Sequence, residues 1–155
     1  MRAGLGVDAH RFLAGRKLFL GGIEVAHSEG LAGHSDADVV LHALMDAILG
    51  ACGAGDIGEL FGDTDEKYRD ASSVELLAEV MSMVTSLGFK VANADIVVIC
   101  EEPKIGPCRQ RMREKIAGVL GVGAEAVSVK GTTTEGMGFT GRGEGICAMA
   151  TVLVE

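Results

Sequence analysis

The sequence predicts a single α+β domain over residues 1–155, with helices packed on one face of a mostly antiparallel β-sheet. Three observations support this fold class. Strand patterns occupy both ends of the chain, two central segments repeat apolar residues every three or four positions, and no linker or internal repeat divides the chain. Since the elements follow in the order strand, hairpin, helix, helix, strand, helix, strand, strand, we expect a ferredoxin-like sandwich.

Each expected element rests on a local pattern. In chain order they are a strand over residues 3–12, a hairpin over 18–25, helices over 36–49 and 72–87, a strand over 89–100, a helix over 107–120, and strands over 126–130 and 146–154. Alternation in the first strand places Gly4, Gly6, Asp8 and His10 on one face. Because the two glycines lack side chains, we expect a helix or a ligand to approach that face closely.

The first helix is expected from about Asp36 to Leu49, with Ser35 or Asp36 as its N-cap and Gly50 beyond its end. The later helix over 72–87 begins with a capping box, Ser72-x-x-Glu75. The strand over 89–100 is expected to be buried on both faces. The last strand is also apolar on both faces, which indicates that another subunit covers the face without helices.

Composition and charge restrict the class of partner. Hydrophobic residues make up 48% of the chain, but no apolar run reaches the length of a membrane span. The formal net charge is −8, which argues against nucleic acid or an anionic membrane as the main partner. The four cysteines form no C-x-x-C pair and no signal peptide is evident, so we expect reduced thiols in a cytoplasmic protein.

Asp8, His10 and His42 form the first candidate site. If the helix packs on the first strand, these side chains give three nitrogen and oxygen ligands with a fourth position open, as in catalytic zinc sites. Polar residues recur every four positions around His42, namely His34, Asp38, His42 and Asp46. Asp38 and Asp46 are candidates to orient a ligating imidazole. The alternative is hydrogen-bonded core histidines beside a solvated helix surface.

The loop over residues 131–145 is the second candidate site. It contains three hydroxyls and a carboxylate, Thr132-Thr133-Thr134-Glu135, followed by a glycine-rich segment that includes Arg142. Hydroxyls and exposed backbone N–H groups suit phosphate oxygens, Glu135 suits Mg²⁺ or Mn²⁺, and Arg142 offers a bidentate donor. The alternative is a flexible connection between two strands.

Two further loops carry weaker signals. Asp56-Ile57-Gly58 and Phe61-Gly62-Asp63-Thr64-Asp65 contain closely spaced carboxylates, which suit polyol hydroxyls or a hard cation. A solvated acidic turn is the simpler interpretation of both. Glu102-Pro103-Lys104-Ile105-Gly106 has exposed backbone beside a proline, and only additional evidence would make it a nucleobase site.

Taken together, these motifs resemble the 2-C-methyl-D-erythritol 2,4-cyclodiphosphate synthase family of the non-mevalonate isoprenoid pathway. The resemblance covers nearly the whole chain in order, and its most specific part runs from Thr132-Thr133-Thr134-Glu135 to Phe139-Thr140-Gly141-Arg142-Gly143-Glu144-Gly145. It implies a homotrimer with active sites between subunits. It also implies release of CMP from a 4-diphosphocytidyl-methylerythritol 2-phosphate as the substrate's own 2-phosphate attacks the β-phosphorus.

The resemblance implies a role for each matching residue. Asp8, His10 and His42 would hold Zn²⁺, Glu135 would contact Mg²⁺ or Mn²⁺, and His34 and Thr133 would position phosphates and support the transition state. Substrate contacts would come from Asp8, Ala9, His10, His34, Ser35, Asp56, Ile57, Gly58, Phe61, Gly62, Asp63, Thr64, Asp65, Cys100, Glu101, Glu102, Pro103, Lys104, Ile105, Gly106, Thr132, Thr133, Thr134, Glu135, Phe139 and Arg142.

Two other functions remain open at the level of sequence. One is a zinc-dependent phosphoester hydrolase, which needs a general base near the open zinc position, with Asp38 or Asp46 as candidates. The other is a nucleotide-binding regulatory module without turnover. Solvent oxygen would enter the product of the hydrolase but not the product of an intramolecular cyclisation.

Overall fold

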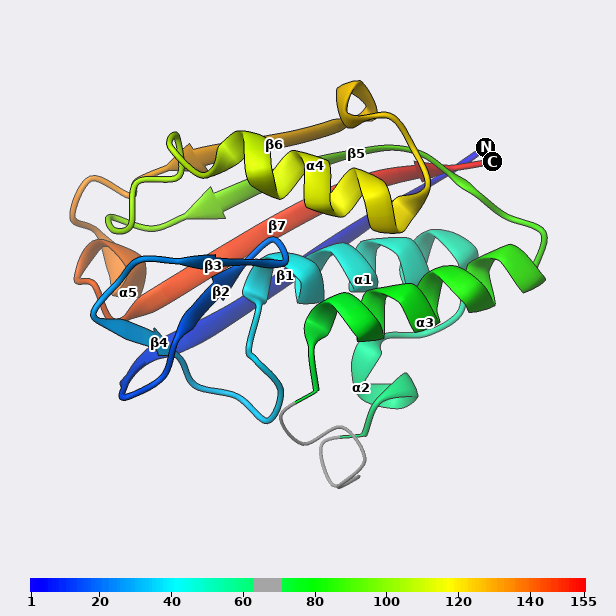
Figure 1. The fold of residues 1–155 in the computed structure, drawn as a ribbon. Coiled ribbons are helices and arrows are strands. Elements are labelled where there is room, and N and C mark those ends of the chain that lie inside the picture. Colours follow the sequence, from blue (N-terminus) through cyan, green and yellow to red (C-terminus); the bar gives the residue numbers. More distant parts are fainter. Residues whose placement is uncertain (63–70) are drawn as a thin grey trace.

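Helices cover one face of a twisted β-sheet in the computed structural model, which describes residues 1–62 and 71–155 (Figure 1). The sheet strands are β1 (Arg2–Ala14), β4 (Glu29–Leu31), β5 (Val91–Ile99), β6 (Val127–Thr132) and β7 (Gly145–Val154). A separate hairpin consists of β2 (Leu18–Leu20) and β3 (Ile23–Val25). The helices are α1 (Val39–Cys52), α2 (Ile57–Leu60), α3 (Ser73–Ser86), α4 (Arg109–Leu120) and α5 (Gly138–Gly141), with a 3₁₀ turn over Ala124–Ala126.

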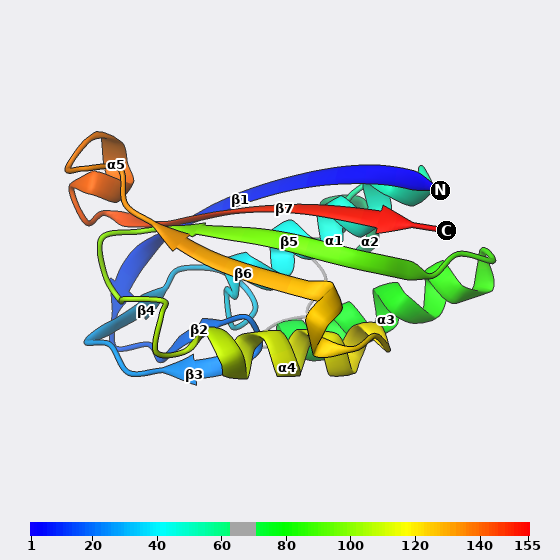
Figure 2. The same cartoon turned by 90° about the horizontal axis from the view of Figure 1, so that it is seen from above.

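The five strands lie in the order β4-β1-β7-β5-β6, and every neighbouring pair is antiparallel except β5 and β6. That parallel pair is joined through α4. Figure 2 shows the sheet as one layer with α3 and α4 on a single side of it. The α+β class and the layers are therefore confirmed, but the order of elements differs from the βαββαβ order of a ferredoxin-like sandwich.

Helix α1 lies unusually close to β1, as the two glycines predicted. A Cβ atom on Gly4 would lie 1.8 Å from the carbonyl oxygen of Ala47, and one on Gly6 would lie 2.0 Å from that of Ala43. Both distances are far below van der Waals contact, so only glycine permits this approach. The helix is almost wholly buried, and its apolar side chains share one core with the inner face of the sheet.

The predicted limits of α1 are wrong at both ends. Asp38 is the N-cap, and its carboxylate accepts hydrogen bonds from the backbone N–H groups of Val40 and Leu41. The helix cannot begin at Asp36 because Ala37 has a φ of 57°. At the other end, Gly50 stays helical and the chain leaves the helix at Gly53, which has a φ of 70°. His34 consequently lies in the preceding loop and not on the helix.

Other expectations were met in part. The hairpin and α3 form where predicted, but the side chain of Ser72 makes no capping hydrogen bond. The sequence patterns did not reveal β4, α2 or α5. None of the helices in the described part of the chain is both long and apolar enough to span a membrane.

The face of the sheet opposite the helices is apolar and open in the single chain. Strands β5 and β7 alternate between buried and partly exposed residues. The expected burial of β5 on both faces is therefore wrong for the single chain, and the outward residues of β7 lie on the face that another subunit was expected to cover. The outer face, defined here by Leu5, Val7 and Met149, leaves these side chains 61%, 51% and 38% exposed. Apolar area of this kind is typical of a surface that another chain covers.

Candidate metal and substrate site

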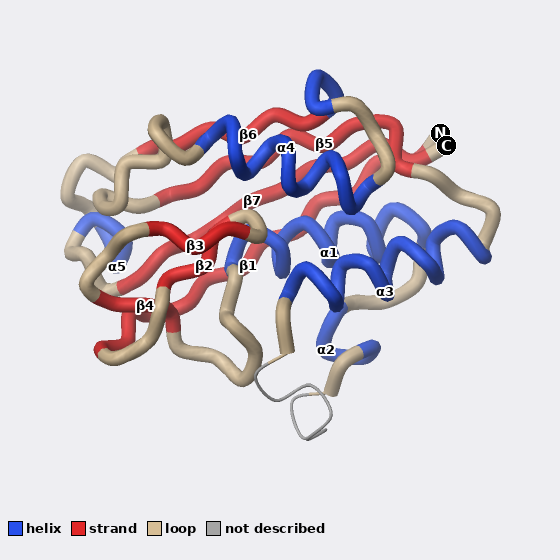
Figure 3. The backbone as a smooth tube through the Cα atoms, in the orientation of Figure 1, coloured by secondary structure: helices blue, strands red, loops and turns tan. Residues whose placement is uncertain are grey.

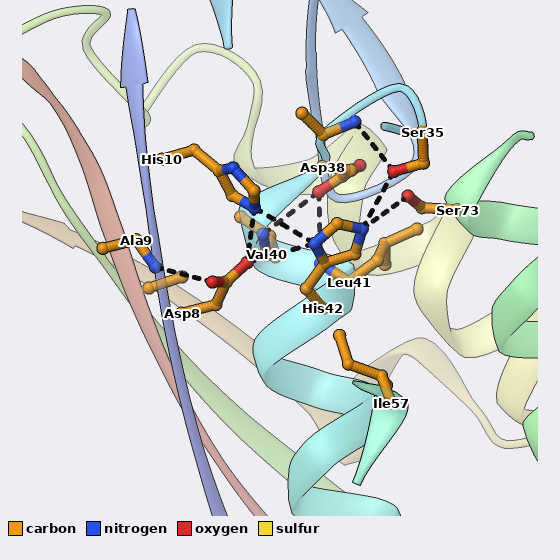
Figure 4. Close-up of polar contacts among 12 residues, drawn as sticks. Asp8, Ala9, His10, Ser35, Asp38, Val40, Leu41, His42, Ile57 and Ser73 are labelled. Carbon is orange, nitrogen blue, oxygen red and sulfur yellow. Dashed lines mark hydrogen bonds and ion pairs between the residues drawn. The ribbon is translucent and has the colours of Figure 1, made fainter. Parts of the chain in front are cut away.

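Asp8, His10 and His42 meet between β1 and α1 (Figure 4). Oδ2 of Asp8 lies 2.9 Å from Nε2 of His10 and 3.1 Å from Nδ1 of His42, and the two imidazole nitrogens are 3.2 Å apart. One potential ligand atom from each residue lies within 4.8 Å of the other two. The structure therefore brings the three predicted side chains together as a group that could hold a metal ion.

The surroundings of His10 turn one nitrogen toward the cluster. Its Nδ1 lies 2.6 Å from the carbonyl oxygen of Ala32, which can only accept a hydrogen bond. Nδ1 therefore carries the proton, and the lone pair of Nε2 in the neutral ring points toward Asp8 and His42. A backbone carbonyl that orients a ligating imidazole in this way is usual behind metal sites, so the donor set fits a divalent cation.

Contacts within the cluster shift the pKa values of Asp8 and His10. Burial alone would raise the pKa of Asp8, but hydrogen bonds to His10 and His42 outweigh it and hold this pKa well below its ordinary value. Burial would lower the pKa of His10, but the hydrogen bond and the charge of Asp8 raise it above 6.5. Asp8 is thus a carboxylate at neutral pH, the form in which it can bind a cation.

Asp38 and Asp46 do not orient the imidazoles, contrary to one sequence-based interpretation. Besides capping α1, the fully buried carboxylate of Asp38 accepts the N–H groups of Gly21 at 2.9 Å and Gly22 at 2.6 Å. It therefore fastens the β2–β3 hairpin to the start of the helix. Oδ1 of Asp46 accepts the N–H of Ile57 at 2.9 Å, and burial raises the pKa of Asp46.

Two serines contact His42 at Nε2, the ring nitrogen on the side away from Asp8 and His10. Its Nε2 lies 3.2 Å from Oγ of Ser35 and 3.1 Å from Oγ of Ser73, and Figure 4 shows both hydroxyls approaching the same ring nitrogen. Ser35 was expected to contact substrate, whereas its hydroxyl faces His42. Ser73 was not predicted at all, because it comes from α3 and its sequence context resembles an ordinary helix start.

His34 lies in an exposed loop beside this cluster. The guanidinium of Arg16 donates to the carbonyl oxygen of Gly33 at 2.6 Å and also to that of Ser35, so it holds the backbone on both sides of His34. The side chain of His34 itself is exposed. Sequence patterns gave no signal for Arg16, since the turn between β1 and β2 is not periodic.

The Asp56–Gly58 segment begins α2 close to α1. Oδ1 of Asp56 accepts the N–H of Glu59 at 2.9 Å and so caps α2, while Asp46 anchors Ile57 one helical turn beyond His42. Figure 4 shows Ile57 beside that part of α1. Phe61 ends α2 and is only 8% exposed, and Gly62 follows it. Asp63, Thr64 and Asp65 lie outside the described residues.

The two segments predicted for the nucleotide lie together at the other edge of the sheet. The carboxylate of Glu101 accepts the N–H groups of Thr134 at 3.2 Å and Gly136 at 3.4 Å, and Cys100 N–H donates to Thr132 at 3.1 Å. These bonds join the loop over 100–106 to the loop after β6. Lys104 is exposed and its Nζ donates to the carbonyl oxygen of Glu101 at 2.9 Å.

Within the loop after β6, the threonines have different surroundings. Thr134 Oγ1 lies 3.0 Å from Oγ1 of Thr140, so this hydroxyl forms a hydrogen bond within the segment between β6 and β7. Thr133 Oγ1 donates to Oε1 of Glu135 at 3.1 Å, and Glu135 is exposed with a φ of 53°. Glu135 and Gly136 both have left-handed backbone, with φ values of 53° and 78°, so the chain turns sharply after β6.

The sheet register separates the two halves of the expected site within one chain. Ala9 pairs with Cys147, Cys147 with Ile99, and Ile99 with Thr132. With strands about 4.8 Å apart, Thr132 lies about 14 Å across the sheet from Ala9. The alternation of β1 also places the methyl group of Ala9 on the face opposite Asp8 and His10.

Phe139 and Arg142 lie at the α5 end of the sheet (Figure 1). Phe139 is 42% exposed, and Nε of the exposed Arg142 donates to Oε1 of Glu144 at 2.6 Å. Arg142 therefore has a carboxylate partner within its own loop.

Comparison with known proteins identifies the family. A model of the YgbB family matches residues 1–155. The chain belongs to the YgbB family. The 2-C-methyl-D-erythritol 2,4-cyclodiphosphate synthase of Moorella thermoacetica is 55% identical over 154 residues, which are 99% of this chain and 94% of the relative.

Solved structures agree with this assignment. The bifunctional IspDF from Campylobacter jejuni matches with a TM-score of 0.95 and 44% identity, over 99% of this chain and 42% of that longer chain. A CDP-bound 2C-methyl-D-erythritol-2,4-cyclodiphosphate synthase matches with a TM-score of 0.91 and 36% identity, over 99% and 100%. The Moorella relative and the CDP-bound structure are both named as synthases, so neither a hydrolase nor a regulatory module is supported.

Proposed function

We propose that this protein is a phosphorus–oxygen lyase that converts 4-diphosphocytidyl-2-C-methyl-D-erythritol 2-phosphate to 2-C-methyl-D-erythritol 2,4-cyclodiphosphate and CMP. In this reaction an oxygen of the 2-phosphate bonds to the β-phosphorus, and the bond from that phosphorus to the oxygen bridging it to the α-phosphate breaks. CMP leaves with the bridging oxygen. The observation that carries the proposal is the Asp8–His10–His42 cluster in a chain of the YgbB family.

The metal ions are assigned from the donor chemistry. Two imidazoles and one carboxylate suit Zn²⁺ with an open fourth position, and the exposed carboxylate of Glu135 suits Mg²⁺ or Mn²⁺. When bound, these cations supply charge neutralisation for the diphosphate. They explain how a chain of net charge −8 acts on a polyphosphate.

The protein groups position the substrate and do not attack it. The substrate phosphate is the nucleophile, and burial raises the pKa of the Cys100 thiol to about 11, so this thiol stays protonated. His34 and Thr133 are assigned to the phosphates. The segments Asp56–Gly58 and Phe61–Asp65 are assigned to the methylerythritol part, and Cys100–Gly106 with Thr132 to the cytidine. CDP bound to a similar synthase supports a cytidine site of this kind.

A homotrimer with sites between subunits accounts for two features of the single chain. The Asp8 cluster and the loop after β6 are separated by the width of the sheet, yet both are assigned to one substrate. The exposed apolar outer face offers a surface for association. We assign the reaction to the cytoplasm, in keeping with four cysteines that are all free thiols.

The reaction is tested by CMP release from the cytidyl substrate in ¹⁸O-labelled water. Intramolecular cyclisation predicts release of CMP in step with the cyclic diphosphate, with no label in either product. Label in a phosphate of either product would mean attack by water and would overturn the proposal. Asp8→Asn, which removes the charge at the centre of the cluster, serves as the inactive control.

A further inference from the structure

We propose that Asp36 and Ser73 together set the ligating form of His42 and thereby raise the affinity of the cluster for its metal. The inference rests on the proposed metal-binding function of Asp8, His10 and His42, and it assigns a positioning role to two residues outside that cluster. The contacts that carry it join three separate segments of the chain: the loop before α1, α1 itself and the first turn of α3.

The direction of each hydrogen bond follows from the carboxylate. Oγ of Ser73 is within hydrogen-bond distance of Oδ1 of Asp36, and an ionised carboxylate can only accept. The single hydroxyl proton of Ser73 is therefore given to Asp36. Because this proton is already used, Oγ of Ser73 can only accept a hydrogen bond from Nε2 of His42, which lies 3.1 Å away. Nε2 therefore carries a proton.

In the neutral ring of His42, a proton on Nε2 means that Nδ1 is unprotonated. The lone pair of Nδ1 is then available to the cluster. Nδ1 is the atom that lies 3.1 Å from Asp8 and 3.2 Å from His10. A carboxylate acting through a hydroxyl thus fixes the tautomer of His42, as the Ala32 carbonyl does for His10. The negative charge of Asp36 also makes the imidazole a stronger electron donor to a bound cation.

Ser35 does not provide an equivalent link. Its Oγ lies 3.2 Å from Nε2 of His42, but it accepts the N–H of Ala37 and bonds to no carboxylate among the described residues. The hydroxyl of Ser35 is free to donate or to accept toward the ring. Ser73 is the contact that determines which of the two occurs.

Asp36 is itself held rigidly. Its Oδ2 accepts the N–H of Ser73 at 3.0 Å, and its own N–H donates to the carbonyl oxygen of Ala71 at 3.2 Å. Figure 3 shows the segments leading into α1 and α3 next to each other at this point. Ser73 has no exposed surface, so water does not compete for its hydroxyl.

The test compares Ser73→Ala and Asp36→Asn with Ser72→Ala. Ser72 is a matched control because it is the adjacent serine and makes no side-chain capping bond. The zinc dissociation constant of each metal-free protein is measured by competition with a chromophoric chelator, and circular dichroism checks that each variant is folded. We expect Ser73→Ala to weaken zinc binding about 10- to 100-fold and Asp36→Asn by a smaller factor, with Ser72→Ala unchanged.

A second measurement separates positioning from general destabilisation. In the zinc-loaded protein, the Nε2 proton of His42 should give a downfield NMR signal protected from exchange, and Ser73→Ala should shift it and increase its exchange rate. Equal zinc affinity in Ser73→Ala and Ser72→Ala, with this signal unmoved, would overturn the inference and leave the proposed function standing. Failure of the wild-type protein to bind zinc would instead overturn the proposed metal site.

Discussion

Nε2 of His10 and Nδ1 of His42 lie 3.2 Å apart, although one residue comes from a strand and the other from a helix. The short distance depends on Gly4 and Gly6, which let α1 rest directly on the backbone of β1. Two imidazole nitrogens and a carboxylate at this separation define a point where a small cation can sit. Packing between one helix and one strand therefore creates the chemistry of the site.

His42→Ala should abolish zinc binding and turnover, because it removes one of the three candidate ligands. The protein should still fold, because the His42 side chain lies at the edge of the core. Glu135→Gln should keep the zinc content and weaken only the dependence on Mg²⁺ or Mn²⁺. Metal analysis and CMP release measure both. Full zinc retention in His42→Ala would contradict the site.

Gly6→Ala should destabilise the protein severely, because the new methyl group would lie 2.0 Å from the Ala43 carbonyl oxygen and push α1 off the strand. Gly118→Ala is the matched control at an exposed position of α4, where nothing lies within 4 Å of the added Cβ. It should stabilise by about 0.5–1 kcal/mol. Urea unfolding at one protein concentration gives both values; a mild effect at Gly6 would contradict the close approach.

Asp38→Ala should cost about 3 kcal/mol or more, since four backbone N–H groups lose a buried acceptor. Asp56→Ala removes one bond at an exposed cap of α2 and should cost only about 1 kcal/mol. Chemical denaturation compares the two variants. Similar losses at the two positions would show that Asp38 does not join the hairpin to α1.

Arg16→Ala should lower kcat/KM by a factor on the order of ten to a hundred without changing zinc content, because the backbone on both sides of His34 is released. Lys17→Ala is the control. Among the described residues its ammonium pairs only with exposed Glu24, at 2.9 Å, and this variant should retain full activity. Steady-state kinetics with metal analysis measures the effect, and equal activity in the two variants would exclude a role for Arg16.

Metal binding should tighten as pH rises and should release protons. His10 has a pKa raised above 6.5, and below that pKa its Nε2 carries a proton that a cation must displace. Affinity is therefore lost as pH falls through this pKa. Calorimetry in buffers of different ionisation enthalpy counts the protons released near pH 7. Binding that is independent of pH between 6 and 8 would contradict the raised pKa.

The central cluster was predictable because its information is local. Alternation places Asp8 and His10 on one face of a strand, and the neighbouring glycines indicate that a helix can pack closely on that face. Only the pairing of these residues with His42 had to be inferred. The start of α1 was misplaced because serine and aspartate at 35, 36 and 38 are all good caps. The left-handed backbone of Ala37, which decides among them, has no sequence signature.

Contacts across segments could not be read from any pattern. Ser73 reaches His42 from α3, Arg16 reaches the loop around His34 from a turn, and Glu101 binds the loop after β6. Each depends on how distant elements pack, and each involves a residue type that is common on protein surfaces. The resemblance to a known family was needed to connect the separate loops with one substrate.

The two faces of β1 are under different constraints. Its inner face holds two glycines that α1 requires and two residues of the metal cluster, so four alternate positions are fixed by neighbours in the same chain. Leu5 and Val7 lie on the outer face and are 61% and 51% exposed. Substitutions on the outer side of this strand would therefore change how the chain associates with other chains, while the packing of α1 and the Asp8–His10–His42 cluster would stay in place.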